Sequence, residues 1–344
     1  MKQCMWVGML KTCIGDKVFI YGGVSMKKKV LGILLAATMV MGTTTIAMAA
    51  SDLTLGTGGT TGTYYAVGGV MATVLNPVME DVDLTVTATG ASKANIQLID
   101  EEDADLAIVQ NDVMYYAYTG TDLFEDEGAY ETFASVAGLY DETVQIVTCF
   151  PDIKSVDDLE GKTVSVGDAG SGTEFNAKQI LGAYGLTFDD INVVNLGFGD
   201  SAESLKDGKI DAAFIVAGAP TTAVTSLATS KEVNILSLDD EHIAALIEKS
   251  PFYTENTIPK EAYGTAEDIK TVAVGAVVIA KDDVSEADVY NFMYGVFENV
   301  DTITEAHAKG AELDLEFASS VTSVPYHAGA AKYFEEKGIT VPSK

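Results

Sequence analysis

Two short loops rich in Gly, Ser and Thr have the clearest potential for binding chemistry. The first is GTGGTTGTYYAVGG, Gly56 to Gly69, and the second is AGSGT, residues 169–173. Each follows a strand-like stretch and precedes a helix-like one. The first N–H groups of a helix have no partner inside it, and the helix dipole adds partial positive charge there. Such a loop can therefore bind an anion through its backbone, with Gly allowing close approach and hydroxyls adding donors.

Neither loop matches a known phosphate-binding motif. A P-loop needs Lys followed by Ser or Thr after its last glycine, but Gly62 is followed by Thr63 and Tyr64. A dinucleotide fingerprint needs GxGxxG, and Thr61 stands where the third glycine should be. Ordinary strand-to-helix turns with Thr and Ser as N-caps are the alternative, and they would be favoured for one loop alone. Two such loops, each opening half of the chain, favour a ligand-binding cleft.

The candidate ligand-binding residues come from these loops and from equivalent places along the chain. Both loops are expected at the carboxyl ends of their strands, where open α/β sheets bind ligands. The candidates are Gly59, Thr60, Thr61 and Tyr64 in the first loop, Ser92 and Asn95 in the ASKAN turn, Gln110 at the end of an expected strand, Ser171, Gly172 and Thr173 in the second loop, and Gly218, whose loop offers only backbone groups.

No pattern in the sequence indicates catalysis, a metal or a cofactor. The histidines His242, His307 and His327 are far apart, and none has HxxxH or HExxH spacing. A nucleophile elbow needs GxSxG, which the residues around Ser171 do not supply. The acidic clusters lack the spacing of a calcium loop. We therefore predict no catalytic residue, no metal ligand and no cofactor, with a secreted α/β hydrolase or transferase as the alternative.

The N-terminal residues have the pattern of an export signal. Lys27 to Lys29 precede an apolar run from Val30 to Gly42, and Ala47-Met48-Ala49 is a small-x-small cleavage site. We expect residues 1–49 to be an upstream extension followed by a signal peptide that starts at Met26. This predicts a soluble periplasmic or extracytoplasmic protein, and an uncleaved N-terminal anchor is the alternative.

The rest of the chain is strongly acidic. Residues 1–49 contain six of the 21 lysines and one of the 51 acidic residues, which leaves a net charge near 15 − 50 = −35. The sequence contains no arginine. Because nucleic acids and anionic lipids are bound largely by basic side chains, neither is an expected partner. Cys149 is the only cysteine after residue 49, which excludes an internal disulfide and a thiolate metal site there.

Strand-like and helix-like segments alternate along the chain, which predicts an α/β fold. Asp105 in DADLAIV is echoed by Asp211 in KIDAAFI, and this echo indicates two halves of similar plan. Two separate apolar strands are expected at 132–140 and 143–149. One long helix is expected from Ser285 to Thr302.

Two lobes with a hinged cleft between them are predicted. The first lobe is expected to contain residues 50–142 and 271–344, because the C-terminal segment would pack back on it, and the second lobe residues 143–270. No linker rich in Pro, Gly or Ser separates these segments. Strands are therefore expected to cross the hinge.

Taken together, these motifs resemble the TAXI family of TRAP transporter solute receptors, which are extracytoplasmic binding proteins of the type II periplasmic fold. Ala66 and Ala328 stand where the family usually has Pro, which concerns backbone shape more than ligand contact. The matching stretches run from residue 56 to 338 and are GTGGTTGTYYAVGG, TGASKANIQLI, ADLAIVQNDVMYYAYTG, DLEGKTVSVGDAGSGTEFNAKQILGAYGL, DGKIDAAFIVAGAPT and VPYHAGAAKYFEEKG.

The resemblance implies two lobes that close on a small ligand and deliver it to a membrane permease driven by an ion gradient. It also implies a carboxylate ligand, either a glutamate-like amino acid or an organic acid. The expected partners are thus a small anionic or zwitterionic solute and a TRAP permease. Related receptors that bind the carboxylate with an arginine cannot be the model here, whereas a clamp of two helix N-termini fits the composition. A sensory ligand-binding module is a further alternative.

Overall fold

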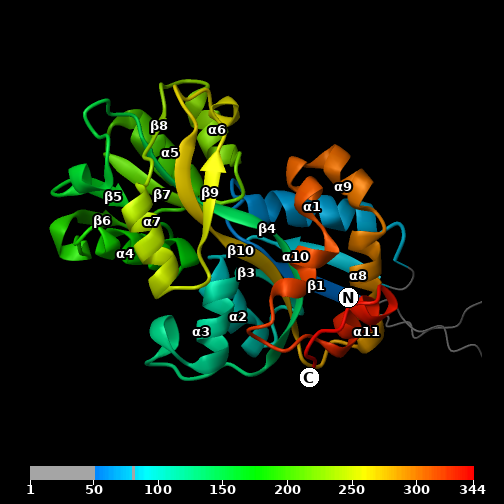
Figure 1. Ribbon diagram of the computed structural model, residues 1–344. Coiled ribbons are helices and arrows are strands. Elements are labelled where there is room, and N and C mark those ends of the chain that lie inside the picture. The colour runs from blue at the N-terminus through cyan, green and yellow to red at the C-terminus, as the bar shows by residue number, and fades with distance from the viewer. Residues whose placement is uncertain (1–50, 80–81) are drawn as a thin grey trace, which may run out of the picture. The chain divides into compact units, whose positions relative to one another are not determined.

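The computed structural model describes residues 51–79 and 82–344, which form helices packed around one mixed sheet (Figure 1). The predicted extension and signal peptide at 1–49 lie outside the described residues. The strands are β1 (Ser51–Gly56), β2 (Val82–Thr87), β3 (Leu106–Gln110), β4 (Phe133–Thr148), β5 (Thr163–Ser165), β6 (Asn192–Val194), β7 (Ala212–Ala217), β8 (Asn234–Ile235), β9 (Thr254–Ile258) and β10 (Ile269–Lys281).

Helices follow most of the strands. They are α1 (Thr63–Leu75), α2 (Ser92–Asp100), α3 (Asn111–Thr119), α4 (Gly172–Ala183), α5 (Phe198–Asp207), α6 (Thr222–Ala228), α7 (Asp240–Lys249), α8 (Glu286–Phe297), α9 (Val300–Ala306), α10 (Leu315–Ser320) and α11 (Ala328–Glu336), with short 3-10 helices η1 (Asp122–Phe124), η2 (Val156–Leu159), η3 (Phe188–Asp190), η4 (Lys260–Ala262) and η5 (Ala308–Glu312). Within the described residues, no helix combines the length and the apolar character needed to cross a membrane.

The sheet repeats one plan in its two halves. Its strand order is β2-β1-β3-β10-β4-β7-β5-β6, with β8 paired to β4 and β9 paired to β10. In the first half β1 lies parallel between β2 and β3, and in the second half β5 lies parallel between β6 and β7. Strand β10 is antiparallel to β3, and β4 is antiparallel to β7. In each half, the parallel strands are therefore bordered on one side by a long antiparallel strand, which is β10 in the first half and β4 in the second.

The Asp echo seen in the sequence has a structural counterpart in the two halves. The Asp105 carboxylate accepts a hydrogen bond from the backbone N–H of Thr54 at 2.8 Å. The Asp211 carboxylate accepts one from the backbone N–H of Thr163 at 2.7 Å. Asp105 thus links the start of β3 to β1, and Asp211 links the start of β7 to β5. The two links occupy equivalent places in the two halves, which confirms the similar plan.

The two strands expected at 132–140 and 143–149 form one continuous strand, β4, so that prediction was wrong. In the sequence the acidic pair Asp141 and Glu142 interrupts the apolar strand pattern. In the structure, however, Asp141 pairs with Gly275 of β10 and Glu142 pairs with Val274. Protein donors bind their carboxylates, because Asn256 donates to Asp141 at 3.2 Å and Tyr64 donates to Glu142 at 2.7 Å. Partnered carboxylates allow the strand to continue through polar residues.

The long helix expected at 285–302 is also divided, into α8 and α9. Asn299 separates them with backbone angles of −125° and 23°, outside the helical range. Its side-chain amide donates to the carbonyl of Gly295 at 2.8 Å. Asn side chains that bond the local backbone in this way compete with helical hydrogen bonding.

The apolar core consists of separate clusters that β4 and β10 connect. One cluster contains β1–β3, α1–α3, the first part of β4, the last part of β10 and the C-terminal helices α8 and α11. Two further clusters cover opposite faces of the second half and contain β5, β7, α4, α7 and the remaining parts of β4 and β10. Both long strands pass from one group of elements to the other (Figure 1). The exact lobe boundaries given above stay a prediction.

The C-terminal helix α11 packs closely on α8. A Cβ at Gly329 of α11 would overlap the carbonyl oxygen of Glu286 and lie 2.9 Å from the backbone nitrogen of Tyr290. We therefore expect Gly329→Ala to lower the free energy of unfolding by about 1–3 kcal/mol, because the two helices must move apart.

The matched control is Gly182→Ala, since Gly182 lies exposed in α4 with open space around its Cβ position. That substitution is expected to be neutral or to stabilise by up to about 1 kcal/mol. Denaturant unfolding of both variants checks the pair, and equal stabilities would contradict the packing of α11 on α8.

Candidate functional site

A cavity lies between the two loops predicted to bind a ligand. Its volume is about 40 Å³, room for about three water molecules. It is lined by Gly58, Gly59, Gly62, Thr63, Tyr64, Ala91, Ser92, Gln110, Glu142, Asp168, Ser171, Gly172, Thr173, Phe198, Val216 and Ala217. These residues come from both halves of the sheet, so closing the cavity requires the two halves to meet.

The N-terminal turns of α1 and α4 both line this cavity. In residues 51–79 and 82–344, the backbone N–H groups of Thr63, Tyr64, Gly172 and Thr173 donate no hydrogen bond to the protein. Both helices have more than two turns, so their dipoles add partial positive charge at the same ends. The cavity therefore has two sets of backbone donors that favour a negatively charged ligand group.

Most of the predicted site residues line the cavity. Those that do are Gly59, Tyr64, Ser92, Gln110, Ser171, Gly172 and Thr173. The side chain of Ser171 is the N-cap of α4, because its Oγ accepts from the N–H of Glu174 at 3.1 Å. The hydroxyl of Thr173 makes no hydrogen bond within the part of the chain that the structure describes, and its residue is buried. Thr173 is therefore the freer of the two side chains.

The other predicted residues, Thr60, Thr61, Asn95 and Gly218, lie outside the cavity lining. Thr60 is exposed to solvent. Thr61 lies against Gly199 of the second half, where a Cβ on the glycine would lie 3.2 Å from the threonine Oγ1. Asn95 is fully buried, and its side-chain nitrogen donates to the carbonyls of Thr57 at 2.6 Å and Ile108 at 2.7 Å. Its side chain thus joins the first loop to β3.

Gly218 belongs to a contact that joins the two halves next to the cavity residues Thr63 and Ala217. Its carbonyl accepts a hydrogen bond from Thr63 at 2.8 Å and another from Thr221 at 3.1 Å. A Cβ at Gly218 would lie 2.8 Å from both Thr63 and the buried side chain of Lys309. A larger residue at this position would therefore have to displace the side chains of Thr63 and Lys309.

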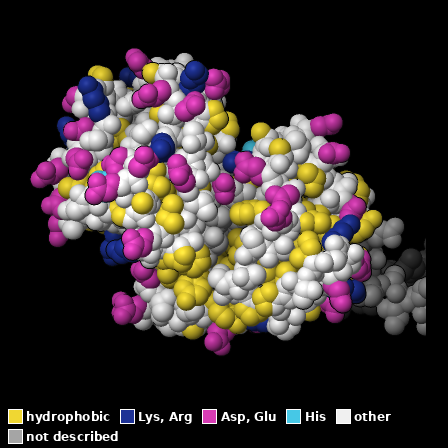
Figure 2. All heavy atoms as spheres, in the orientation of Figure 1, with side chains coloured by type: hydrophobic (Ala, Val, Ile, Leu, Met, Phe, Trp, Pro, Cys, Tyr) yellow, Lys and Arg dark blue, Asp and Glu magenta, His cyan; other side chains and the backbone are white. Residues whose placement is uncertain are grey.

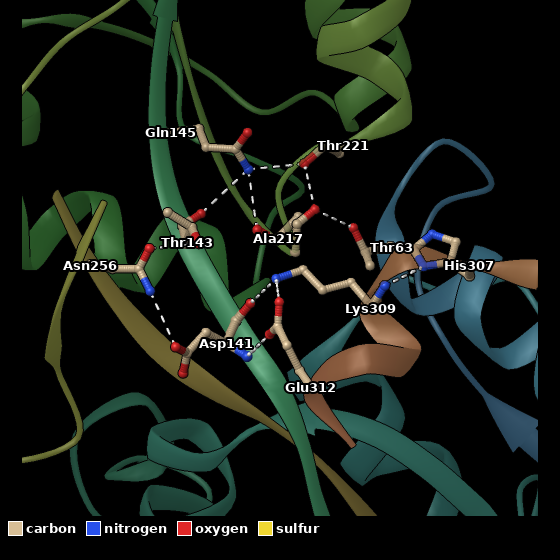
Figure 3. A network of polar contacts seen from close by, with 11 residues as sticks. Thr63, Asp141, Thr143, Gln145, Ala217, Thr221, Asn256, His307, Lys309 and Glu312 are labelled. Atoms are coloured by element: carbon tan, nitrogen blue, oxygen red, sulfur yellow. Dashed lines mark hydrogen bonds and ion pairs between the residues drawn. The ribbon is translucent and has the colours of Figure 1, made fainter. Parts of the chain in front are cut away.

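The side chain of Lys309 packs against this contact. Its ammonium group bonds the carboxylate of Glu312 at 2.6 Å and approaches the carbonyl of Asp141 at 3.4 Å (Figure 3). No lysine is among the residues that line the cavity. The ammonium group of Lys309 thus links η5 to the middle of β4.

A second polar contact joins the halves between α3 and α4. The side-chain nitrogen of Asn176 donates to Asp112 at 3.0 Å and to the hydroxyl of Tyr253 at 2.8 Å. Burial raises the pKa of the Asp112 carboxyl to about 6. The two halves thus meet through polar groups as well as through the long strands.

Two carboxylates in the cavity were missed by the sequence analysis. Glu142 lies in the middle of β4 and is fully buried, and Asp168 directly precedes the second loop and is half-buried. An acidic residue inside an otherwise apolar strand pattern was the signal available for Glu142. Gly58, Gly62, Thr63, Ala91, Phe198, Val216 and Ala217 were also missed.

The surroundings of Glu142 hold its carboxyl group in an acceptor role. Burial raises its pKa to about 8, while hydrogen bonds from Tyr64 and Gln110 act in the opposite direction. The Tyr64 hydroxyl donates to Glu142 Oε2 at 2.7 Å. Burial also raises the pKa of Asp168, with a further contribution from Asp200. A cavity with two carboxyl groups and no basic side chain attracts positive charge.

Backbone strain marks the same cavity. Ala91, which precedes α2, has φ 66° and ψ −147°, a conformation that is essentially restricted to glycine and costs of order 1–3 kcal/mol. Such outliers cluster at ligand-binding positions, because the surrounding structure must impose them.

Residues 55–338 match the model of the NMT1-like family. Among solved structures, a protein from Bordetella bronchiseptica RB50 has a TM-score of 0.54 at 14% identity, over 84% of this chain and 98% of that chain. The alkanesulfonate-binding protein SsuA from Xanthomonas axonopodis pv. citri bound to MOPS has a TM-score of 0.48 at 14% identity, over 85% and 92%. A putative L-cystine ABC transporter from Listeria monocytogenes has a TM-score of 0.48 at 15% identity, over 78% and 99%.

The sheet order and the repeated halves define an α/β protein of the type II periplasmic binding protein fold, so the predicted fold class is confirmed. The match over most of the chain shows that it belongs to the NMT1-like family. At 14% identity the likeness to the Bordetella protein shows a shared fold alone. The finer TAXI assignment stays a prediction.

The side chain of Asn95 is expected to contribute to the free energy of unfolding and not to ligand binding. Asn95→Ala leaves the buried carbonyls of Thr57 and Ile108 without their side-chain donor, so the free energy of unfolding should fall by about 2–4 kcal/mol. Denaturant unfolding measures this loss. Unchanged stability with lost ligand binding would instead place Asn95 among the ligand contacts.

Glu142 is expected to make stability depend on pH. Its folded pKa lies above its ordinary value of 4.5, so the folded protein binds more protons than the unfolded chain between pH 4.5 and about 8. Stability contributed by the protonated group is therefore lost as pH rises through this range. Glu142→Gln keeps the shape and removes the charge, so the variant should be more stable than the unaltered protein at pH 8, by roughly a few kcal/mol.

Thermal unfolding at pH 5 and pH 8 checks this expectation. The difference between the two proteins should shrink towards pH 5, where the carboxyl group is protonated in the folded state. A variant that is less stable at both pH values would contradict the buried, charge-free role of the group in the empty protein.

Proposed function

We propose that this protein is an extracytoplasmic solute-binding receptor of a TRAP-type secondary transporter. In this role it binds one small solute that carries a carboxylate and delivers it to a membrane permease. The observation that carries the proposal is the cavity between the N-terminal turns of α1 and α4, where both halves present unpaired backbone donors. A solute bound there contacts both halves at once.

A solute that contacts both halves gives a physical reason why ligand binding would favour closure of the two halves. The contacts Thr63 to Gly218 and Asn176 to Asp112 exist only when the halves meet. Opening would break them and expose the cavity, with bending expected in β4 and β10, which connect the two groups of elements. A solute that binds both helix N-termini stabilises the closed arrangement by the difference in its affinity for the two arrangements.

The cavity residues support binding without chemistry. None of the three histidines lines the cavity, and neither does Cys149. The hydroxyl of Ser171 caps α4 and has no base beside it among the cavity residues. Catalysis by acyl transfer would need a nucleophile bonded to a base, which this geometry lacks. We propose no cofactor and no metal for this site.

The surface charge and the sequence support a location outside the cytoplasm and a membrane permease as the partner. Asp and Glu side chains are spread over the face shown in Figure 2, with few lysines among them. The export-signal pattern before residue 50 supports a location outside the cytoplasm, and the motif resemblance to TAXI receptors supports a TRAP permease as the partner. A solute receptor requires neither nucleic acid nor an anionic membrane surface, which agrees with the acidic composition.

Thr173 provides a test of the ligand site that leaves the α4 cap intact. Thr173→Val removes one hydroxyl at nearly constant volume, so solute binding should weaken by about 1–3 kcal/mol if that hydroxyl contacts the ligand. Calorimetric titration with small carboxylic and amino acids measures the change, and thermal unfolding of the empty variant serves as the control.

Stoichiometric binding without conversion of the solute is the expected result for the unaltered protein. Consumption of the solute would contradict a receptor and favour the enzyme alternative. An unaltered dissociation constant in the Thr173 variant would remove this residue from the site.

A further inference from the structure

The cavity contains an excess of hydrogen-bond acceptors as well as the donors of two helices. Gln110 is buried, with an exposure of 2%, and its Oε1 has no hydrogen-bond partner within the described residues. Its amide nitrogen faces Glu142, so the oxygen is turned towards Gly172 at the start of α4. Because buried acceptors are normally paired, an unpaired acceptor at this place favours a ligand that supplies a donor.

Carboxyl groups add to this excess of acceptors. Glu142 accepts hydrogen bonds from Tyr64 and Gln110, and these donors favour its ionised form once a positively charged group lies beside it. Asp168 lines the cavity from the other half. No lysine lines the cavity, and the charge of Lys309, which is paired with Glu312 outside the cavity, favours the ionised form of Glu142 to a small extent. Ammonium groups carry three donors and one positive charge, which matches what these three side chains lack.

We propose that the cavity selects solutes that carry both a carboxylate and a positively charged amino group, with Glu142, Gln110 and Asp168 receiving the amino group. The carboxylate then lies against the free N–H groups of α1 and α4. The solute class is accordingly the α-amino acids, and Glu142 is the residue that distinguishes them from organic acids. This inference rests on the proposed receptor function and narrows its ligand.

Other ligand classes leave part of the cavity unmatched. An organic dicarboxylate would place a second negative group near Glu142 and Asp168, where burial and the neighbouring acidic groups disfavour a further negative charge. A simple amine would satisfy the carboxylates but leave the N–H groups of both helices unpaired. The cavity volume of about 40 Å³ further favours a short side chain.

Matched pairs of solutes test the proposal. L-Alanine is compared with pyruvate and L-lactate, and L-glutamate with 2-oxoglutarate, by calorimetric titration of the unaltered protein at pH 7. Within a pair the side chain stays the same and the amino group is replaced. At least one amino acid is expected to bind about tenfold or more tightly than its partners, since an interaction with a charged group is lost. Ethylamine, which has no carboxylate, is expected not to bind.

Glu142→Gln serves as the matched variant, because it keeps an acceptor oxygen but cannot ionise when an ammonium group binds beside it. The preference for the amino acid over its keto acid should fall about tenfold or more in this variant, while circular dichroism and thermal unfolding confirm that it folds. Asp168→Asn gives a second, independent measurement of the same preference.

The outcomes separate the two proposals. Equal or tighter binding of the keto acid or hydroxy acid would overturn the amino-group inference and leave the receptor function standing. Tight binding of ethylamine would overturn the role of the helix N-termini. Binding of none of these solutes would overturn the proposed carboxylate receptor itself.

Discussion

The buried carboxyl group of Glu142 is the constraint on which the site depends. It lies in the middle of a continuous strand, with no basic side chain in the cavity and with two protein donors directed at it. A carboxyl group in such a place costs stability in the empty protein, because burial disfavours its charge. Side chains that reduce stability in a cavity between two halves are typical of binding sites, where the ligand supplies the missing partner.

The fold explains why this carboxyl group can reach the cavity. Strands β4 and β10 belong to both core groups, so residues in their middle lie where the two halves meet. The parallel strands β1 and β5 then place the loops before α1 and α4 on either side of the same space. The interlobe position of Glu142 and the opposed helix N-termini are thus consequences of one sheet plan repeated in each half.

The sequence allowed the fold class and most of the cavity loops to be predicted, but not the carboxyl groups. Periodicity and loop composition identified the strand–loop–helix units that contain Tyr64 and Thr173, because those features are local. Glu142 could not be assigned in this way, since its role depends on Tyr64, which is 78 positions away in the chain. Asn95 shows the opposite case: its polar side chain suggested ligand contact, whereas tertiary packing directs it to two buried carbonyls.

A crystal structure of the protein with its tightest-binding amino acid tests the central claim most directly. The account predicts one solute between the two loops, with its carboxylate at the N-termini of α1 and α4 and its amino group against Glu142 and Gln110. Electron density for the solute outside this cavity, or a solute bound with its carboxylate against Glu142, would contradict the account.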